Sequence, residues 1–130
     1  MLKKIKRFER LATLRKRDIS KEVSNSNLLK TEIIKNNNLI TQIDTIMDNG
    51  KSEEKDQIIS SGYFKNNAQL LSTLQSQKNI ADNRNKYLLN EQKNTQQKII
   101  MNNLKKIKAE EKTIEYKKQY SNELEKKNFS

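Results

Sequence analysis

The chain of 130 residues contains no cysteine, histidine, tryptophan or proline, and it has only 2 glycines. Without cysteine and histidine it can form neither disulfides nor thiolate or imidazole metal sites, and a nucleophile–histidine pair is excluded as well. The lack of cysteine is compatible with a reducing compartment. Tyrosine, lysine and glutamate are the only potentially catalytic residue types in useful number, so we expect no enzymatic activity and no cofactor.

Long hydrophobic runs are also missing. Hydrophobic residues make up 32% of the chain and charged residues 33%, which leaves too little apolar surface for a thick multilayer core. No apolar run approaches the roughly 18 residues needed to span a bilayer, and the basic N-terminus is not followed by the apolar segment of a signal peptide. We therefore expect a single soluble, cytoplasmic domain over residues 1–130.

Apolar residues recur instead with a helical period. If Ile5 is position a of a heptad, most a positions over the first fifty residues are apolar, and this spacing is typical of a coiled-coil seam with polar gaps. The pattern predicts a first helix over about residues 2–48. Its a positions are Ile5, Ala12, Ile19, Ser26, Ile33, Ile40 and Met47, and its d positions are Phe8, Arg15, Glu22, Leu29, Asn36 and Ile43.

The two glycines suggest where the first helix ends and the second begins. We expect the helix to end at residues 48–50, with Gly50 in the left-handed conformation that closes many helices. Ser52 is expected to cap a short helix that runs to about Ser60, before a second break at residues 60–62. The predicted connector is therefore 49–62.

The second half of the chain, about residues 63–127, contains neither proline nor glycine, so nothing in its covalent chemistry interrupts a helix. Its apolar residues recur at three- and four-residue steps and form two successive stripes along the predicted helix. The two stripes do not share one heptad register, so we expect a stutter near Thr95, between them. The predicted fold is all-α, an antiparallel two-helix coiled-coil hairpin with a longer C-terminal helix. The first stripe contains Leu74, Ala81 and Leu88, and the second contains Ile100, Leu104, Ile107 and Ile114.

The net charge of +11 is concentrated near both ends of the chain. Residues 1–21 carry nine basic and two acidic side chains, a net +7, and residues 98–130 carry nine basic and five acidic, a net +4. Residues 22–97 carry nine of each. A hairpin would bring the two basic segments side by side, either as a solvated face that maintains solubility or as a surface that docks on an acidic protein, nucleic acid or an anionic membrane.

Two of these partners follow from simple chemistry. Nucleic acid is one, because lysine and arginine neutralise phosphates and release counterions, although few aromatic residues are present to stack on bases. An anionic membrane surface is the other, because one face of a helix rich in basic residues carries Leu2, Ile5, Phe8 and Ala12. That face is also expected to pair with the second helix, and it cannot do both at once.

A protein partner is favoured by a resemblance. The stretches LATLR at 11–15, KEV at 21–23 and LL at 28–29 resemble the N-terminal signature of the flagellar FliJ family, and YFKN at 63–66 and LLSTL at 70–74 are similar to the family after the connector. The chain also resembles that family in size, in its two unequal helices and in its basic end. The injectisome stalk proteins of type III secretion share this layout.

The resemblance implies a small non-enzymatic component of the type III export apparatus, peripheral at the inner face of the cell membrane and serving flagellum biogenesis, motility and chemotaxis. It would insert into the export ATPase ring, promote ring assembly and couple it to the export gate, with export chaperones as further partners. Leu70 and Leu74 would face the gate, unless they simply pack in the seam. The residues implied to face the ring are Lys3, Lys4, Arg7, Arg10, Arg15, Arg17, Lys105, Lys106 and Lys108.

Overall fold

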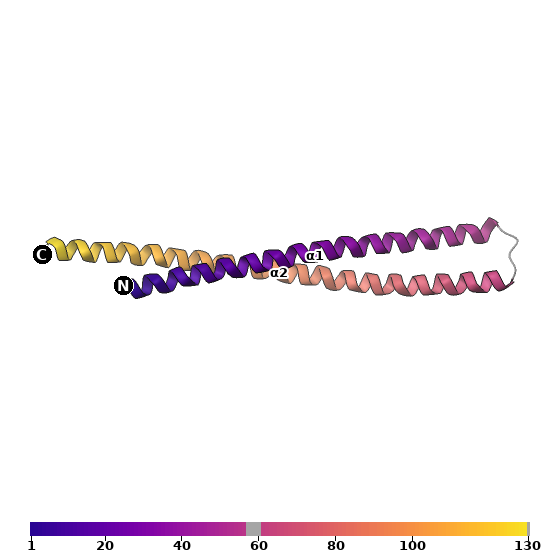
Figure 1. Cartoon of the computed structure of the whole chain (residues 1–130), viewed down its shortest axis with the longest axis horizontal. Helices are drawn as coiled ribbons and strands as arrows, with labels where there is room; N and C mark the ends of the chain where they lie inside the picture. Colours follow the sequence, from indigo (N-terminus) through magenta and orange to yellow (C-terminus); the bar gives the residue numbers. More distant parts are fainter. Residues whose placement is uncertain (57–60, 130) are drawn as a thin grey trace. The chain divides into compact units, whose positions relative to one another are not determined.

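The computed structural model describes the backbone of residues 1–56 and 61–129, and the side chains of 1–50 and 65–129. Two α-helices account for all of this backbone except Met1: α1 (Leu2–Asp56, 55 residues) and α2 (Ser61–Phe129, 69 residues) (Figure 1). No strand occurs among the described residues. The expectation of an all-α hairpin with a longer second helix is confirmed.

The two helices pack against each other in antiparallel fashion. Glu9, near the start of α1, pairs with Lys117 late in α2, whereas Asp44, late in α1, pairs with Lys78. The contacts divide the chain into two compact units. We call residues 1–27 with 93–130 the terminal unit and residues 28–92 the central unit.

The seam on α1 has the predicted register. Every predicted a and d position from Ile5 to Met47 is buried or half-buried, because these positions recur on the face that meets α2. One polar residue of this seam makes a hydrogen bond to the other helix. Asn36 is only 6% exposed, and its side-chain amide donates a hydrogen bond of 2.8 Å to the backbone carbonyl of Ala81 on the other helix. This bond favours one alignment of the two helices over its alternatives.

The predicted end of the first helix at residues 48–50 is wrong. Helix α1 continues through Gly50 to Asp56, and Gly50 does not adopt a positive φ. The physical reason is packing, because the Asn67 side chain lies 3.5 Å from the Gly50 carbonyl oxygen and Leu71 lies beside the Gly50 backbone. Tertiary contacts of this kind routinely override the weak intrinsic preference of a glycine to leave a helix.

The predicted connector changes accordingly. Residues 51–56 belong to α1 rather than to a separate short helix. Helix α2 begins at Ser61, so the expected break at 60–62 is wrong for Ser61 and Gly62, and α2 ends at Phe129 rather than near residue 127. The remainder of the expected short helix and of the break, at residues 57–60, lies outside the described residues.

The expected stutter near Thr95 is also wrong. Thr95 is itself buried, at 6% exposure, and the seam on α2 passes through it with unbroken alternation of four- and three-residue steps. The stripe of Leu74, Ala81 and Leu88 continues into the small or polar residues Thr95, Asn102 and Ala109. The buried or half-buried seam positions are Asn67, Leu71, Leu74, Lys78, Ala81, Asn85, Leu88, Gln92, Thr95, Ile99, Asn102, Lys106, Ala109, Thr113, Tyr116 and Tyr120.

The second apolar stripe on α2 therefore lies outside the seam. Ile100, Leu104 and Ile114 are 61%, 61% and 67% exposed, and Ile107 is 39% exposed. In the heptad of α2 these residues occupy positions on the side of the helix opposite the seam. Hydrophobicity alone predicted the wrong face of this part of α2, because most of the residues that meet α1 there, such as Thr95, Asn102 and Ala109, are small or polar.

The central unit contains the apolar core. Ile43 and Met47 of α1 pack with Leu74 of α2, and Leu71 covers this cluster. Neither helix, within the part of the chain that the structure describes, has a stretch long and apolar enough to cross a membrane.

Candidate partner-binding surface

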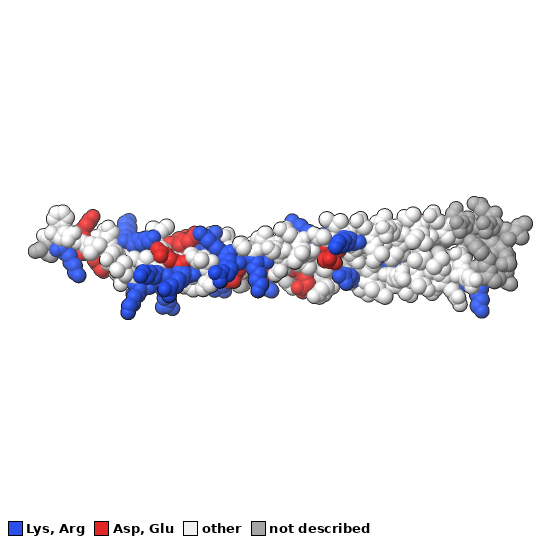
Figure 2. Space-filling model, in the orientation of Figure 1, with Lys and Arg blue, Asp and Glu red and all other residues white. Residues whose placement is uncertain are grey.

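The net positive charge resides in the terminal unit. This unit contains nineteen basic and eight acidic residues, which accounts for the whole net charge of +11, whereas the central unit contains eight of each. In Figure 2 the blue side chains gather over the indigo and yellow-orange segments of Figure 1, which belong to the terminal unit. The prediction that the two basic segments lie side by side is confirmed, because Glu9 contacts Lys117 at 3.1 Å and Arg15 contacts Asn102 at 3.2 Å.

The predicted ring-binding residues all lie in the terminal unit, but they differ in exposure. Arg15 and Lys106 are half-buried because both occupy seam positions. The Arg15 guanidinium donates a hydrogen bond to the Asn102 side-chain oxygen and lies 3.7 Å from the Asp18 carboxylate. The charge and one donor of the Arg15 guanidinium are therefore already partnered within the terminal unit. The exposed members are Lys3, Lys4, Arg7, Arg10, Arg17, Lys105 and Lys108.

The structure brings these residues together in two places. Lys3, Arg7 and Arg10 surround Leu11 and Leu14 on α1. Residues Arg15, Lys105 and Lys108 line a groove between α1 and α2. Lys4 instead lies over the ring of Tyr116, with its ammonium nitrogen 5.4 Å from the ring centroid. Arg17 and Lys106 line neither of these two surfaces.

The two predicted gate-binding residues lie in the central unit and have different environments. Leu74 is 8% exposed and belongs to the apolar core with Ile43 and Met47. Leu70 is 50% exposed. Leu74 thus packs in the seam, and Leu70 is the member of the pair whose side chain a partner can reach.

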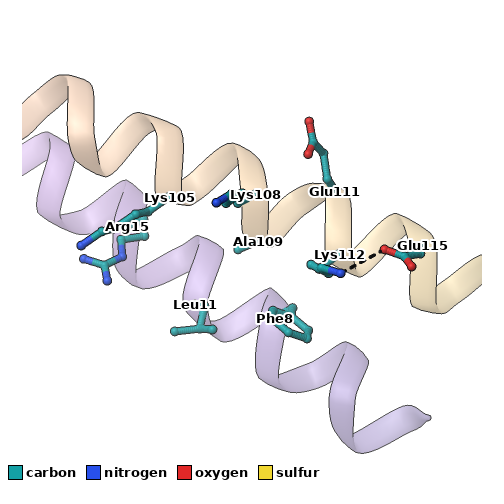
Figure 3. Close-up of a pocket in the computed structure, with 9 residues that line it drawn as sticks. All are labelled: Phe8, Leu11, Arg15, Lys105, Lys108, Ala109, Glu111, Lys112 and Glu115. Carbon is teal, nitrogen blue, oxygen red and sulfur yellow. Dashed lines mark ion pairs between the residues drawn. The ribbon is translucent and has the colours of Figure 1, made fainter.

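The groove of the terminal unit, called here the terminal groove, has an apolar floor and a charged rim (Figure 3). Its volume is about 570 Å³. The floor consists of Phe8, Leu11 and Ala109. The rim consists of Arg15, Lys105, Lys108, Glu111, Lys112 and Glu115.

Contacts between the helices hold the floor of the groove in place. The rings of Phe8 and Tyr116 are stacked, with centroids 5.6 Å apart and an interplanar angle of 16°. One face of Phe8 is therefore occupied, and offset-stacked rings of this kind add to the stability of their packing. On the rim, the Lys112 ammonium lies 3.4 Å from the Glu115 carboxylate.

Six groove residues were not among the sequence-predicted site residues: Phe8, Leu11, Ala109, Glu111, Lys112 and Glu115. A sequence signal for one of them does exist. Lys98, Lys105 and Lys112 recur every seven residues and directly precede seam positions of α2. Lysines at such positions line the edge of a two-helix seam. The seven-residue spacing of these lysines identifies Lys112 as a groove residue only when the seam positions of α2 are already known.

The arrangement is suited to binding a ligand that is both anionic and partly apolar. Its basic rim attracts anionic groups, and its apolar floor can cover an apolar side chain. Among the residues that the structure describes, no group of three or more acidic side chains is placed to hold a metal ion.

No protein-family model, curated protein or solved structure matches this chain. The fold and the terminal unit define its class by themselves: an all-α helical hairpin with a strongly basic unit that contains both terminal segments.

Proposed function

We propose that the protein is a non-enzymatic component of a type III protein export apparatus, flagellar or injectisome. Its terminal unit inserts into the ring of the export ATPase and promotes assembly of the ring. The central unit connects the ring to the export gate, so the protein acts in the cytoplasm at the inner face of the membrane. The observation that carries the proposal is the location of the entire net charge of +11 in the terminal unit.

The charge distribution supports insertion by one unit rather than by the whole chain. A strongly positive unit is attracted to an acidic ring lumen, which accelerates association and makes it sensitive to salt. The neutral central unit lacks this attraction. It offers the exposed Leu70 as an apolar contact for the gate. The FliJ-like stretches in both helices favour this partner over other acidic proteins.

The decisive experiment mixes the protein with its cognate export ATPase at low salt and measures ATP hydrolysis and ring formation. The wild-type protein is expected to increase both. Reversing three exposed charges of the terminal unit, Arg7→Glu, Arg10→Glu and Arg17→Glu, is expected to abolish the effect while helix content stays unchanged. A wild-type protein that changes neither hydrolysis nor ring formation contradicts the proposal.

A matched control is available in the central unit. Lys30, Lys65 and Lys86 are exposed there, so Lys30→Glu, Lys65→Glu and Lys86→Glu change the net charge by the same amount. This control variant is expected to retain most of the effect on the ATPase. Equal loss in both triple variants would mean that net charge alone, and not the terminal unit, determines binding.

The alternative partners, nucleic acid and an anionic membrane, have less support. Phe8 stacks on Tyr116 rather than presenting a free ring to a base. Ile5 and Ala12, on the face that a membrane would bind, are buried in the seam. Retention of the protein by duplex DNA or anionic vesicles at about 50 mM salt, where attraction to phosphate is strong, would favour the alternative.

A further inference from the structure

We propose that the terminal groove binds an acidic amphipathic helix of the partner protein. Apolar side chains of this helix cover Phe8, Leu11 and Ala109, and its carboxylates pair with the lysines of the rim. The inference deepens the proposed function. It rests on that function for one point only, which is that the export ATPase is the protein that supplies the helix. It adds the secondary structure, the charge and the place of the bound segment.

The floor of the groove is apolar surface that the hairpin leaves uncovered. Phe8 and Leu11 are half-buried, so each still exposes part of its side chain. Ala109 occupies a seam position with a side chain of a single methyl group, and this leaves room beside it. Ala109 itself is only 6% exposed, so a partner seated there removes from water mainly the exposed parts of Phe8 and Leu11, which is favourable in proportion to the area covered.

The rim supplies cations without internal partners. Within the described residues, Lys105 and Lys108 take part in no ion pair, whereas Lys112 is paired with Glu115 at 3.4 Å. Glu111 also lines the groove and is a carboxylate on the rim (Figure 3). Among these described residues, the two unpaired lysines outnumber the single unpaired carboxylate of the rim, so the rim has an excess of positive charge that carboxylates complement.

The shape of the groove favours a helix as the occupant. Its walls are two antiparallel helices, and side chains of a third helix fit between such walls as they do in helix-in-groove complexes. A bound strand would need a free sheet edge, and the described part of the chain contains none. From Lys105 to Glu115 the groove extends about 15 Å along α2, which corresponds to about three helical turns.

Other occupants satisfy only part of this surface. Phosphates of a nucleic acid would pair with the lysines but would leave the apolar floor uncovered. The headgroups of an anionic membrane would pair with the lysines, but a flat lipid surface does not enter a recess between two helices and would leave the floor uncovered. A second copy of the chain would bring together two terminal units that each carry +11.

Two variants test the two parts of the groove separately. Leu11→Gln removes apolar floor without changing charge, and Lys105→Gln with Lys108→Gln removes two cations without changing the floor. Each has a matched control in the same unit. Leu104→Gln removes an apolar residue that is 61% exposed on α2, and Lys118→Gln with Lys126→Gln removes two exposed cations outside the groove.

The first measurement uses a model ligand and the full chain. A fluorescent peptide of about 18 residues, long enough to form a helix, carries leucines at i, i+3, i+4 and i+7 flanked by glutamates. Fluorescence anisotropy is expected to show binding to the wild-type protein. We expect at least about tenfold weaker binding by both groove variants, and less than about a twofold change for both controls. Circular dichroism checks that each variant remains helical.

Several results would overturn the inference. One is equal binding of a peptide in which lysines replace the glutamates, and another is equal weakening by the control variants. A third is that duplex DNA or phosphatidylglycerol vesicles displace the peptide from the wild-type protein and bind the Leu11→Gln variant more weakly than wild type. That result would assign the groove to the DNA or the vesicles. Sedimentation that shows a dimer of the wild-type protein but a monomer of Leu11→Gln would assign it to a second copy.

The second measurement separates this inference from the proposed function. The same four variants are added to the cognate export ATPase, and ring binding is measured. If the wild-type protein binds and the groove variants bind as well as their controls, the groove inference is wrong and the function stands. If the wild-type protein does not bind the ATPase but binds the acidic peptide through the groove, the function is wrong and the groove inference stands for another partner.

Discussion

The central and terminal units are built from the same two helices but differ in what holds the helices together. The central unit has an apolar cluster of Ile43, Met47 and Leu74, and its charges are balanced. Ion pairs link its helices, with Lys78 lying 2.7 Å from Asp44 and Arg84 lying 3.4 Å from Glu32. These features contribute to packing and alignment of the unit.

The terminal unit has a more polar seam and a large excess of one charge. Thr95, Thr113 and Ala109 occupy buried seam positions, and Arg15 bonds to Asn102 across the seam. Its net charge of +11 opposes folding through repulsion among its own side chains. The comparison teaches that the apolar cluster and the excess positive charge lie in different units. We expect substitutions in the central unit to affect stability most and substitutions in the terminal unit to affect binding most.

The largest expected effect comes from the apolar core of the central unit. Leu74→Ala removes a side chain that is 8% exposed in the cluster with Ile43 and Met47. The unfolding free energy is expected to fall by about 2–4 kcal/mol, because transfer and cavity terms add. Urea denaturation followed by circular dichroism measures the change.

The control for this variant is Leu104→Ala in the terminal unit, where the side chain is 61% exposed. It is expected to change the unfolding free energy by less than about 0.5 kcal/mol. Comparable losses in the two variants would mean that Leu104 is covered in solution. The contrast between the units would then fail.

A smaller effect is expected at the polar seam of the central unit. Asn36→Ala removes the hydrogen bond to the Ala81 carbonyl and part of a buried side chain. We expect a loss of about 1–2 kcal/mol in the unfolding free energy. Asn38→Ala, at an exposed position on the same helix, is the control and should be nearly neutral. If Asn36→Ala is equally neutral in thermal denaturation, this bond does not align the helices.

The continuity of α1 predicts a stabilising change. An added Cβ at Gly50 would lie 3.5 Å from Leu71 Cδ2 and 3.7 Å from Asn67 Oδ1, which are ordinary van der Waals distances. Gly50→Ala is therefore expected to raise the unfolding free energy by about 0.5–1 kcal/mol, because alanine favours the helix. Thermal denaturation measures the shift. A destabilised variant would indicate that residue 50 leaves the helix after all.

The smallest expected effect is a pH dependence in the central unit. The hydrogen bond and the charge of Asp44 raise the pKa of Lys78 above its ordinary value of 10.5. A raised lysine pKa contributes stability that is fully present below about pH 10.5 and is lost as the pH rises through the raised value. Lys78→Gln is expected to show less loss of stability than wild type over this range.

The comparison variant for this pH effect is Lys86→Gln, which removes an exposed lysine of the same unit. The stability of Lys86→Gln should depend on pH as that of the wild-type protein does, because both proteins keep Lys78 and its pair with Asp44. Parallel profiles for Lys78→Gln and wild type would show that the pair with Asp44 does not contribute to folding.

Much of the fold was predictable because a helix needs only local information. The register of α1 was predicted residue by residue, since its seam positions include enough isoleucine and methionine to identify the face. On α2 the same reasoning worked from Leu74 to Leu88 and was wrong beyond Thr95. There the stronger apolar stripe, from Ile100 to Ile114, is not the stripe that meets α1.

The candidate site was predicted in part. The residues that line the basic surfaces include Arg7, Arg10, Lys105 and Lys108 as expected. Lys112 and Ala109 were missed, because their placement depends on the true seam of α2. The resemblance implied that Arg15 and Lys106 face the ring, but both are half-buried at seam positions, as the heptad had already predicted for Arg15. A charged residue at a seam position cannot be distinguished from an exposed one by its type.

The sequence by itself determined that this chain is helical, because it has no proline and its apolar residues recur every three or four positions. It also determined the uneven charge, since hairpin folding brings together segments that are already basic. Only the tertiary structure decided which face of α2 meets α1 and that Gly50 stays in the helix. The physical reason is that both depend on contacts between residues distant in the sequence, such as Asn36 with Ala81 and Gly50 with Asn67.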